Sequence, residues 1–281
     1  MIGSVGTFAN GFVLLALLCT RQSRRKNINV FIINQTFLDL LSCLFLIFTI
    51  VVNDIKTASI AVKWITCLLF KTKTIVAVVS YSSIFGLVVI TVERYVKVVH
   101  PVAHRNHYRR WMTYAGVILP WIDGVCCYLI PAWATASMVD GKCLGFQWST
   151  QEMYNAYVLT MFVLHHVLPP AFFFFAYYRI IGVIRRQQSI VAPNVDATSP
   201  ALAGGSSHTA SRAAHGHMKH KREMNVVRTM TIIVLCFCIC YLPYNVYLPL
   251  FPGVSLSYLL QPLQHFTFFT VSLLSCHSIC L

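Results

Sequence analysis

Residues 74–100 read TIVAVVSYSSIFGLVVITVERYVKVVH, an apolar run that stays uncharged until the pair Glu93-Arg94. Cys67 precedes Arg94 by 27 residues, and an α-helix of that length is about 40 Å long. A lipid bilayer with its headgroup regions has the same thickness. The pattern therefore predicts a membrane-spanning helix with Cys67 and Arg94 at opposite faces of the membrane.

The rest of the chain has the same apolar character. Of its 281 residues, 57% are hydrophobic and 11% are charged, whereas soluble domains carry about 25% charged residues. This composition excludes an ordinary soluble enzyme and a disordered chain. The apolar runs are continuous, which favours helices over a β-barrel. We predict an all-α membrane protein, a seven-transmembrane helix bundle, with spans at about 1–20, 28–52, 67–98, 111–132, 156–182, 226–250 and 257–281.

The net charge of +14 follows the connections between the predicted spans. Seventeen of the 22 lysines and arginines lie in or beside the connections after the first, third and fifth spans. Because positively charged connections stay in the cytoplasm, we expect a multi-pass plasma-membrane protein with its amino terminus outside. The charge then contacts the anionic lipid bilayer. No nucleic-acid motif accompanies it, so no nucleic-acid partner is expected.

Residues 187–218 are rich in Ala, Gly, Ser, Pro and His and show no helical or strand period. We predict a disordered cytoplasmic loop there. The histidines of this tract and the cysteines at 236, 238 and 240 suggest metal ligands at first sight. The former lie in the flexible tract, and successive cysteines would be about 200° apart on a helix, so no metal site is predicted.

Cys67 and Cys143 differ from the other cysteines because both fall at predicted extracellular positions. The oxidising exterior permits a disulfide between them, which would tie the second outer loop over the third span. From the spacing alone, a disulfide and two free thiols are equally open.

Asp39 lies in the middle of the second span, in NQTFLDLLSC. A carboxylate at membrane depth must face the bundle interior or a water-filled cavity. Two interpretations stay open. Asp39 is either a protonated or hydrogen-bonded structural residue, or part of a cation or proton site that Ser83 of the third span could face.

Glu223 precedes Pro243 by 20 residues, or about 30 Å of helix, which puts it level with Arg94 at the cytoplasmic face. A charge-assisted pair between the third and sixth spans is geometrically allowed. Two solvated charges fit the pattern as well. Pro243, like Pro169-Pro170 in the fifth span, removes a backbone hydrogen bond and allows a kink.

Together these residues resemble the rhodopsin-like (class A) family of G-protein-coupled receptors across nearly the whole chain. Glu93-Arg94-Tyr95 is similar to the family's helix-three signature. Other residues resemble family positions in helices one, two, four, five and six: Asn10, Asp39, Trp121 with Pro131, Pro169 with Tyr177, and Phe237 to Pro243. In helix five, Pro170 with Tyr178 has the same spacing, so both assignments stay open.

The resemblance implies a receptor, not an enzyme, that passes an extracellular ligand signal to a heterotrimeric G protein as helix six swings outward. It assigns the G-protein switch to Glu93, Arg94, Tyr95 and Glu223. It assigns a sodium-like site, the one cofactor site expected, to Asp39, Ser83 and Ser278. The transmission residues beneath the ligand pocket would be Ile84, Pro169, Phe237, Tyr241 and Pro243.

The chain also departs from the family pattern. Tyr241 replaces the usual tryptophan, and Asn-Pro-x-x-Tyr does not occur before the chain stops at Leu281. Cys67 is two residues further from Arg94 than is usual, which requires a loop or bulge between them. We therefore expect a receptor domain that is truncated at both ends.

The sequence argues against two classes of ligand, monoamines and covalently attached retinal. Val76, or Thr74 if the count starts from Cys67, stands where monoamine receptors carry an aspartate, and residues 257–281 lack the lysine that attaches retinal in opsins. Basic, aromatic and polar residues of the upper bundle suit a peptide or an acidic small molecule: Lys73, Val76, Ser80, His165, Tyr244, Tyr247 and Gln264. Lys73 could equally just extend to the outer interface. The alternative function is a transporter of a small solute, which also places polar groups at mid-membrane.

Overall fold

The structure is a computed structural model, and it describes residues 2–19, 27–52, 59–139 and 142–191. The predicted sixth and seventh spans and residues 192–218 of the predicted loop lie outside the described residues. The described helices are α1 Ile2–Cys19, α2 Asn27–Val52, α3 Ile60–Thr66, α4 Thr74–Val99, α5 Pro101–His107, α6 Arg110–Gly124, α7 Ile130–Thr135, α8 Gln151–Phe162 and α9 Leu168–Val191. Short π-helical segments join three pairs of them: η2 Cys67–Lys71, η3 Val125–Leu129 and η4 Val163–Val167.

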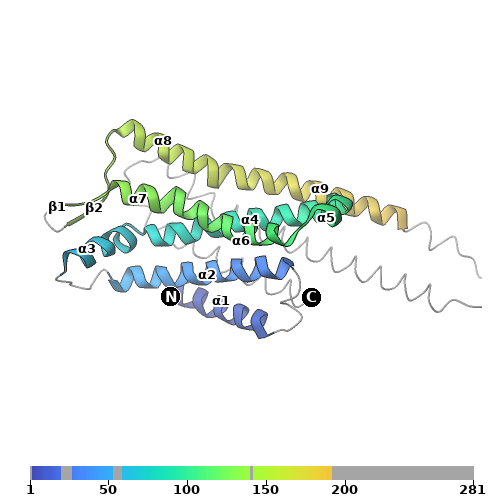
Figure 1. The fold of residues 1–281 in the computed structure, drawn as a ribbon, viewed down its shortest axis with the longest axis horizontal. Coiled ribbons are helices and arrows are strands. Elements are labelled where there is room, and N and C mark those ends of the chain that lie inside the picture. Colours follow the sequence, from blue (N-terminus) through green and yellow to red (C-terminus); the bar gives the residue numbers. More distant parts are fainter. Residues whose placement is uncertain (1, 20–26, 53–58, 140–141, 192–281) are drawn as a thin grey trace, which may run out of the picture.

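Five helical rods run side by side (Figure 1): α1, α2, α3 to α4, α6 to α7, and α8 to α9. Within the described part of the chain, four helical stretches are long and apolar enough to cross a membrane, at 30–52, 60–99, 110–135 and 151–186. The first rod is a shorter apolar helix, Gly3–Cys19. Because lipid cannot satisfy free backbone groups, continuous helices are the structure expected of such sequences.

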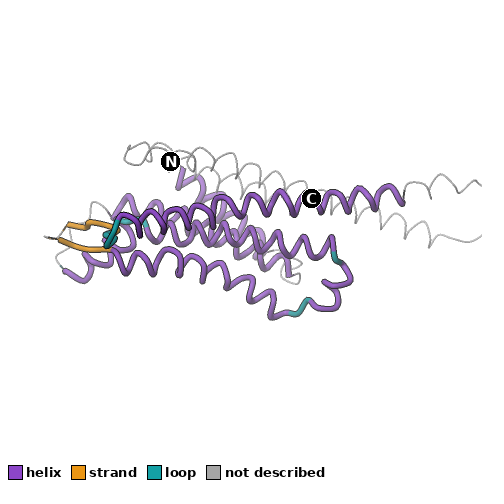
Figure 2. Tube along the Cα trace, turned by 90° about the horizontal axis from the view of Figure 1, so that it is seen from above, coloured by secondary structure: helices purple, strands orange, loops and turns teal. Residues whose placement is uncertain are grey.

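The two ends of the bundle are built differently (Figure 2). At one end, strands β1 Ala136–Val139 and β2 Lys142–Phe146 form an antiparallel hairpin. At the other, α4 ends and the short helix α5 begins with Pro101, whose missing N–H is not needed in a first helical turn. We call these the hairpin end and the arginine end. The hairpin has no counterpart in the sequence prediction.

Helix α4 lies at the centre and packs against α2, α6 and α9. Apolar side chains of α1, α2, α4 and α9 form one core cluster: Val13, Leu17, Phe31, Ile32, Leu87, Ile90, Phe173, Tyr177, Ile180 and Ile184. Large apolar side chains also face outward, including Phe8, Phe12 and Phe174. Outward apolar surface of this kind suits contact with lipid tails.

Two glycines of α6 let it approach its neighbours closely. A Cβ atom on Gly124 would lie 2.5 Å from the carbonyl oxygen of Val78 on α4. On Gly116 it would lie 2.7 Å from the Phe31 ring of α2. Both distances are too short for a side chain, so glycine sets the separation of these helices.

The third rod differs from its predicted bounds. It begins at Ile60 rather than at residue 67, and Cys67 lies inside the wider π-helical turn of η2. Lys73 then takes a left-handed conformation with φ of 57° before α4 starts. These two irregularities are the bulge that the long Cys67–Arg94 spacing required. At the other end of the described chain, α9 continues to Val191, so the prediction of a disordered loop was wrong for residues 187–191.

Candidate functional site

The predicted switch residues stand at the last turns of α4. Glu93 is only 7% exposed, and its carboxylate lies 3.9 Å from Arg94 Nε. His104 of α5 approaches the other carboxylate oxygen, also at 3.9 Å. Tyr95 contacts the rings of His100 and Phe175, which links this site to α9. The structure therefore places a buried acid between two basic groups at the arginine end.

Sequence reasoning missed the α5 side of this site. The His104 ring stacks on Tyr108 with centroids 4.5 Å apart, and the Tyr108 hydroxyl hydrogen-bonds Thr113 at 3.0 Å. Burial raises the pKa of Tyr108, the Thr113 hydrogen bond lowers it, and the Glu93 carboxylate raises it. The net result is a raised pKa, so the phenol stays neutral near Glu93 at physiological pH.

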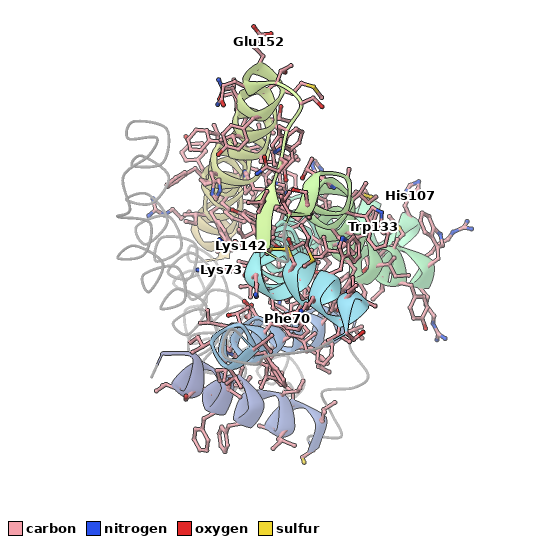
Figure 3. The ribbon with its side chains drawn as sticks, turned by 90° about the vertical axis from the view of Figure 1, so that its left-hand side faces the viewer. Phe70, Lys73, His107, Trp133, Lys142 and Glu152 are labelled. Carbon is pink, nitrogen blue, oxygen red and sulfur yellow. A yellow bond between two sulfur atoms is a disulfide. The ribbon has the colours of Figure 1, made fainter. Side chains whose placement is uncertain are left out.

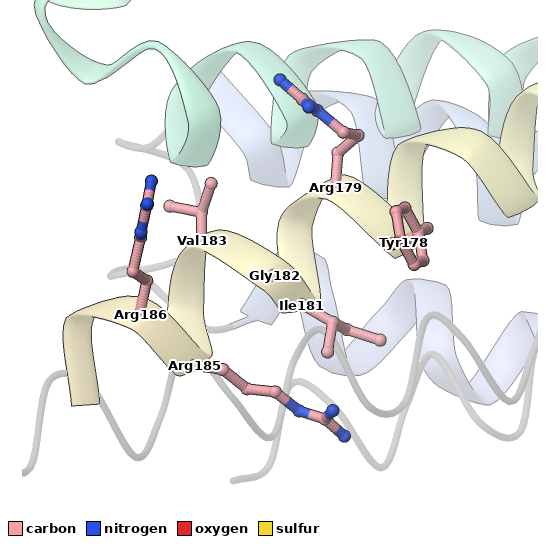
Figure 4. A pocket seen from close by; sticks show the side chains of 7 residues that line it. All are labelled: Tyr178, Arg179, Ile181, Gly182, Val183, Arg185 and Arg186. Atoms are coloured by element: carbon pink, nitrogen blue, oxygen red, sulfur yellow. The ribbon is translucent and has the colours of Figure 1, made fainter. Parts of the chain in front are cut away.

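A cavity of about 610 Å³ opens beside the end of α9 (Figure 4). Among the described residues it is lined by Tyr178, Arg179, Ile181, Gly182, Val183, Arg185 and Arg186. Arg179 and Arg186 point to one side of α9 and Arg185 points to the other (Figure 4). Three guanidinium groups give this surface a positive charge.

The second predicted site lies around Asp39, which is 1% exposed. The Ser83 hydroxyl of α4 donates to Asp39 Oδ1 at 2.6 Å, as the sequence predicted. The Gln35 side-chain amide, one turn earlier on α2, also donates to Asp39 Oδ1, at 3.3 Å, and to Ser83.

These side chains fit a small hard cation. Gln35 Oε1 is buried and has no hydrogen-bond partner among the described residues. The two ends of an amide are interchangeable by a 180° flip. After that flip, the Asp39 carboxylate, the Ser83 hydroxyl and the Gln35 carbonyl would present three oxygens, the ligand type that hard cations prefer. Gln35 was not predicted as a member of this site.

Two further polar residues fasten the helices around Asp39. The Asn10 amide of α1 is fully buried; it donates to the Gly6 carbonyl of its own helix at 2.9 Å and to Cys43 Sγ of α2 at 4.0 Å. The Trp121 indole N–H of α6 donates to Asn34 Oδ1 of α2 at 3.2 Å. Both residues are the ones singled out in the sequence, and both serve packing between neighbouring helices.

The structure decides between the two helix-five assignments. Pro169 and Tyr177 are buried, the latter 6% exposed, whereas Tyr178 is 79% exposed. The pair that faces the bundle is therefore Pro169 with Tyr177. Ile84, another predicted transmission residue, is 1% exposed on α4, which packs against α9.

The hairpin end carries the predicted disulfide. Cys67 and Cys143 are bonded, with their Cα atoms 5.5 Å apart, so β2 is tied to η2. Figure 3 views this end, where Lys73 and Lys142 lie near the disulfide. Val76 follows Lys73 on α4 and is 8% exposed. Two cations thus stand at the end of the bundle where the pocket was predicted.

The remaining predicted pocket residues engage different helices. The hydroxyl of Ser80 hydrogen-bonds Ser42 of α2 at 2.9 Å. His165 of η4 is 1% exposed and lies 3.0 Å from the Asp123 carboxylate of α6. The polar groups of Ser80 and His165 therefore do not face each other. The Asp123–His165 pair was missed because no spacing signal joins residues on separate helices.

The other predicted site residues lie outside the described residues: Glu223 of the switch, Ser278 of the sodium-like site, Phe237, Tyr241 and Pro243 of the transmission set, and Tyr244, Tyr247 and Gln264 of the pocket. Their roles stay predictions.

Comparison with known proteins now identifies the fold. The family described as "7 transmembrane receptor (rhodopsin family)" matches residues 9–280, so the predicted seven-helix bundle is confirmed. The rhodopsins of Myripristis violacea and Galeus melastomus are each 29% identical, over 57% and 58% of this chain. The match covers 41% of either rhodopsin, so the chain spans less than half the length of these curated relatives.

A solved structure agrees with the sequence matches. The crystal structure of squid rhodopsin resembles this chain with a TM-score of 0.71 at 19% identity, covering 97% of this chain and 77% of that chain. At this identity the likeness concerns the fold alone. The transporter alternative finds no support in these matches.

Proposed function

The chain belongs to the rhodopsin family of seven-transmembrane receptors, and from this premise we propose that it passes an extracellular ligand signal to a heterotrimeric G protein. In this proposal the hairpin end faces outward at the plasma membrane, with the amino terminus, and the arginine end faces the cytoplasm. The excess of lysine and arginine in the connections at the arginine end supports this orientation.

One observation supports the proposal: the buried Glu93 carboxylate lies 3.9 Å from Arg94 Nε, at the end of the bundle that would meet the G protein. The Glu93 side chain is 6% exposed and the Arg94 side chain 17% exposed. A charge pair of this burial holds the guanidinium against α4, and His104 adds a second base beside the same acid. Ligand binding would favour a bundle in which Arg94 leaves Glu93 and contacts the G protein.

The outward swing of helix six belongs to the same proposal. The kink for that motion would come from Pro243, and its packing contacts from Phe237 and Tyr241. Glu223, on helix six, would restrain Arg94. Among the described residues, Ile84 of α4 is buried, as are Pro169 and Tyr177 of α9, and α4 packs against α9. A displaced helix six would have to repack against these two helices.

The hairpin end supports an anionic ligand. Lys73 and Lys142 offer cationic groups near the disulfide, and residues 257–281 contain no lysine for retinal attachment. We propose a peptide or an acidic small molecule as the ligand class. Although the similar proteins are rhodopsins, this chain's own residues do not provide the attachment chemistry.

A sodium ion at Asp39 completes the proposal. Asp39, Ser83 and a flipped Gln35 amide would hold it, with Ser278 as a further candidate. A bound cation supplies compensating charge for the buried carboxylate. The residues themselves tie α2 to α4, because the Ser83 hydroxyl of α4 donates to Asp39 and accepts from Gln35.

The test is nucleotide exchange. The chain is reconstituted in lipid nanodiscs with purified heterotrimers of several G-protein classes, and GDP release is followed without ligand. The proposal predicts accelerated release, which Arg94→Ala reduces and Arg110→Ala, an exposed cation at the same end, leaves unchanged. If neither the native chain nor a Glu93→Gln variant accelerates release with any heterotrimer, the proposed function is wrong.

A further inference from the structure

A cluster of three potential metal ligands lies between the fourth and fifth helical rods. The ligand atoms of Asp123, Cys127 and His165 all lie within 4.8 Å of one another. His165 Nε2 is 3.0 Å from Asp123 Oδ2, and Cys127 Sγ is 3.6 Å from Asp123 Oδ1. We propose that these residues form a zinc-binding site that joins the fourth rod to the fifth.

The spacing of the ligand atoms fits tetrahedral zinc. With zinc bonds of about 2.0 Å to nitrogen and oxygen and about 2.3 Å to sulfur, neighbouring ligand atoms are about 3.3 to 3.5 Å apart. The observed 3.0 Å from His165 Nε2 to Asp123 Oδ2 and 3.6 Å from Cys127 Sγ to Asp123 Oδ1 are close to these values, and no two of the three ligand atoms are more than 4.8 Å apart. Small side-chain rotations would therefore complete the coordination, and water would fill the fourth position, as in sites with three protein ligands.

The backbone of both rods changes where the ligands lie. Asp123 and Cys127 are four residues apart and share one face of the helix, and Cys127 lies in the π-helical segment η3. His165 lies in the π-helical segment η4 of the neighbouring rod. The Tyr157 hydroxyl donates to the Cys127 carbonyl at 2.8 Å, which satisfies a backbone group that the irregular turn exposes. Such π-helical interruptions are frequent at functional sites.

Charge also favours a divalent ion here. Asp123 is 13 residues, or about 20 Å, from the start of α6, which is near the middle of the bilayer. An uncompensated charge at that depth is costly. A zinc ion with the Asp123 carboxylate, the Cys127 thiolate and a neutral His165 imidazole carries no net charge. Binding releases the Cys127 thiol proton to solvent, and no electron is transferred.

The three ligands differ in how deeply they are buried. The Asp123 side chain is 13% exposed and Cys127 is half-buried, while His165 is enclosed. The rings of Tyr81 and Tyr128 stand 5.0 and 5.7 Å from the His165 ring and keep it in place. The site therefore combines a fixed imidazole with two more accessible anionic ligands.

The test uses the full chain in nanodiscs, stripped with a chelator and titrated with Co²⁺ and with Zn²⁺. The chain offers a matched pair of thiols, because Cys126 is an exposed free neighbour of Cys127. We expect a thiolate-to-cobalt charge-transfer band and one tightly bound Zn²⁺ in the native chain and in Cys126→Ser. In Cys127→Ser the band disappears and the zinc affinity falls at least tenfold.

Further measurements separate loss of the site from loss of the fold. Zinc should raise the thermal midpoint of the native chain and of Cys126→Ser, but not that of Cys127→Ser or His165→Gln. A native chain without the cobalt band, or a Cys127→Ser variant that binds zinc like the native chain, overturns the proposal. Both readouts measure metal binding, so their outcome does not depend on G-protein coupling.

Discussion

Replacing Glu93 by glutamine should raise ligand-free signalling, because it removes the charge that restrains Arg94 while leaving the shape of the side chain almost unchanged. Glu93 lies 3.9 Å from both Arg94 and His104 in the described bundle. A receptor that releases Arg94 on activation loses this attraction, so the variant stabilises the active bundle relative to the inactive one.

The size of the effect follows from the geometry. Two unit charges 3.9 Å apart attract by about 4 kcal/mol at an effective dielectric of about 20. Desolvation of both groups offsets much of this, which leaves about 1–2 kcal/mol of net restraint. Such a change shifts the ratio of active to inactive bundles roughly 5- to 30-fold. From an active fraction of about 1%, ligand-free exchange should rise about 5- to 20-fold.

The assay is GDP release from a heterotrimer by equal amounts of folded chain in nanodiscs. Glu152→Gln is the matched control, because it makes the same chemical change at an exposed position of the hairpin end. Equal ligand-free exchange by the native chain, Glu93→Gln and Glu152→Gln would refute the idea that Glu93 restrains Arg94.

Three further changes test the packing, the disulfide and the buried carboxylate. Gly124→Ala should lower the free energy of unfolding by about 1–3 kcal/mol and lower the thermal midpoint. Gly182→Ala should not lower the midpoint, because its added Cβ atom would meet no atom within 4 Å. Equal midpoints for the two variants would contradict the close approach of α6 to α4. Cys143→Ser removes a disulfide that joins residues 76 positions apart and that stabilises the fold by up to about 4 kcal/mol. The thermal midpoint of the variant should therefore be insensitive to reductant, and a reductant effect that persists would contradict this. Asp39→Asn should abolish the stabilisation of the native chain by NaCl over choline chloride in thermal unfolding, and a sodium effect that survives would exclude this site.

The end of the bundle and the membrane depth at which a residue lies could be predicted, because helix length and the placement of charged residues determine both. A helix rises by a fixed distance per residue, so Cys67 and Arg94 had to lie at opposite ends of the bundle. The bulge between them was implied by the resemblance to the receptor family, in which this spacing is two residues shorter. The structure confirms both, with Lys73 in the left-handed conformation and Cys67 joined to Cys143. The sequence also predicted that Ser83 could face Asp39, and a hydrogen bond joins the two in the structure.

Lateral contacts could not be predicted in this way, because they depend on how each helix is rotated about its axis. Consecutive residues point about 100° apart. Ser80 therefore faces α2, while its neighbour Tyr81 faces the rings of His165 and Tyr128, although the sequence placed Ser80 and His165 in one pocket. The π-helical segments change this rotation further, which hid the Asp123–His165 pair.

The central claim is that one end of this bundle faces the exterior and the other faces the cytoplasm. Lys142 of the hairpin and His107 of α5, at the arginine end, are exposed residues suited to single-cysteine labelling. A membrane-impermeant thiol reagent on intact cells should label Lys142→Cys above the background of the parent chain, and should label His107→Cys only after permeabilisation. Labelling of both positions on intact cells, or of His107→Cys alone, would contradict the account.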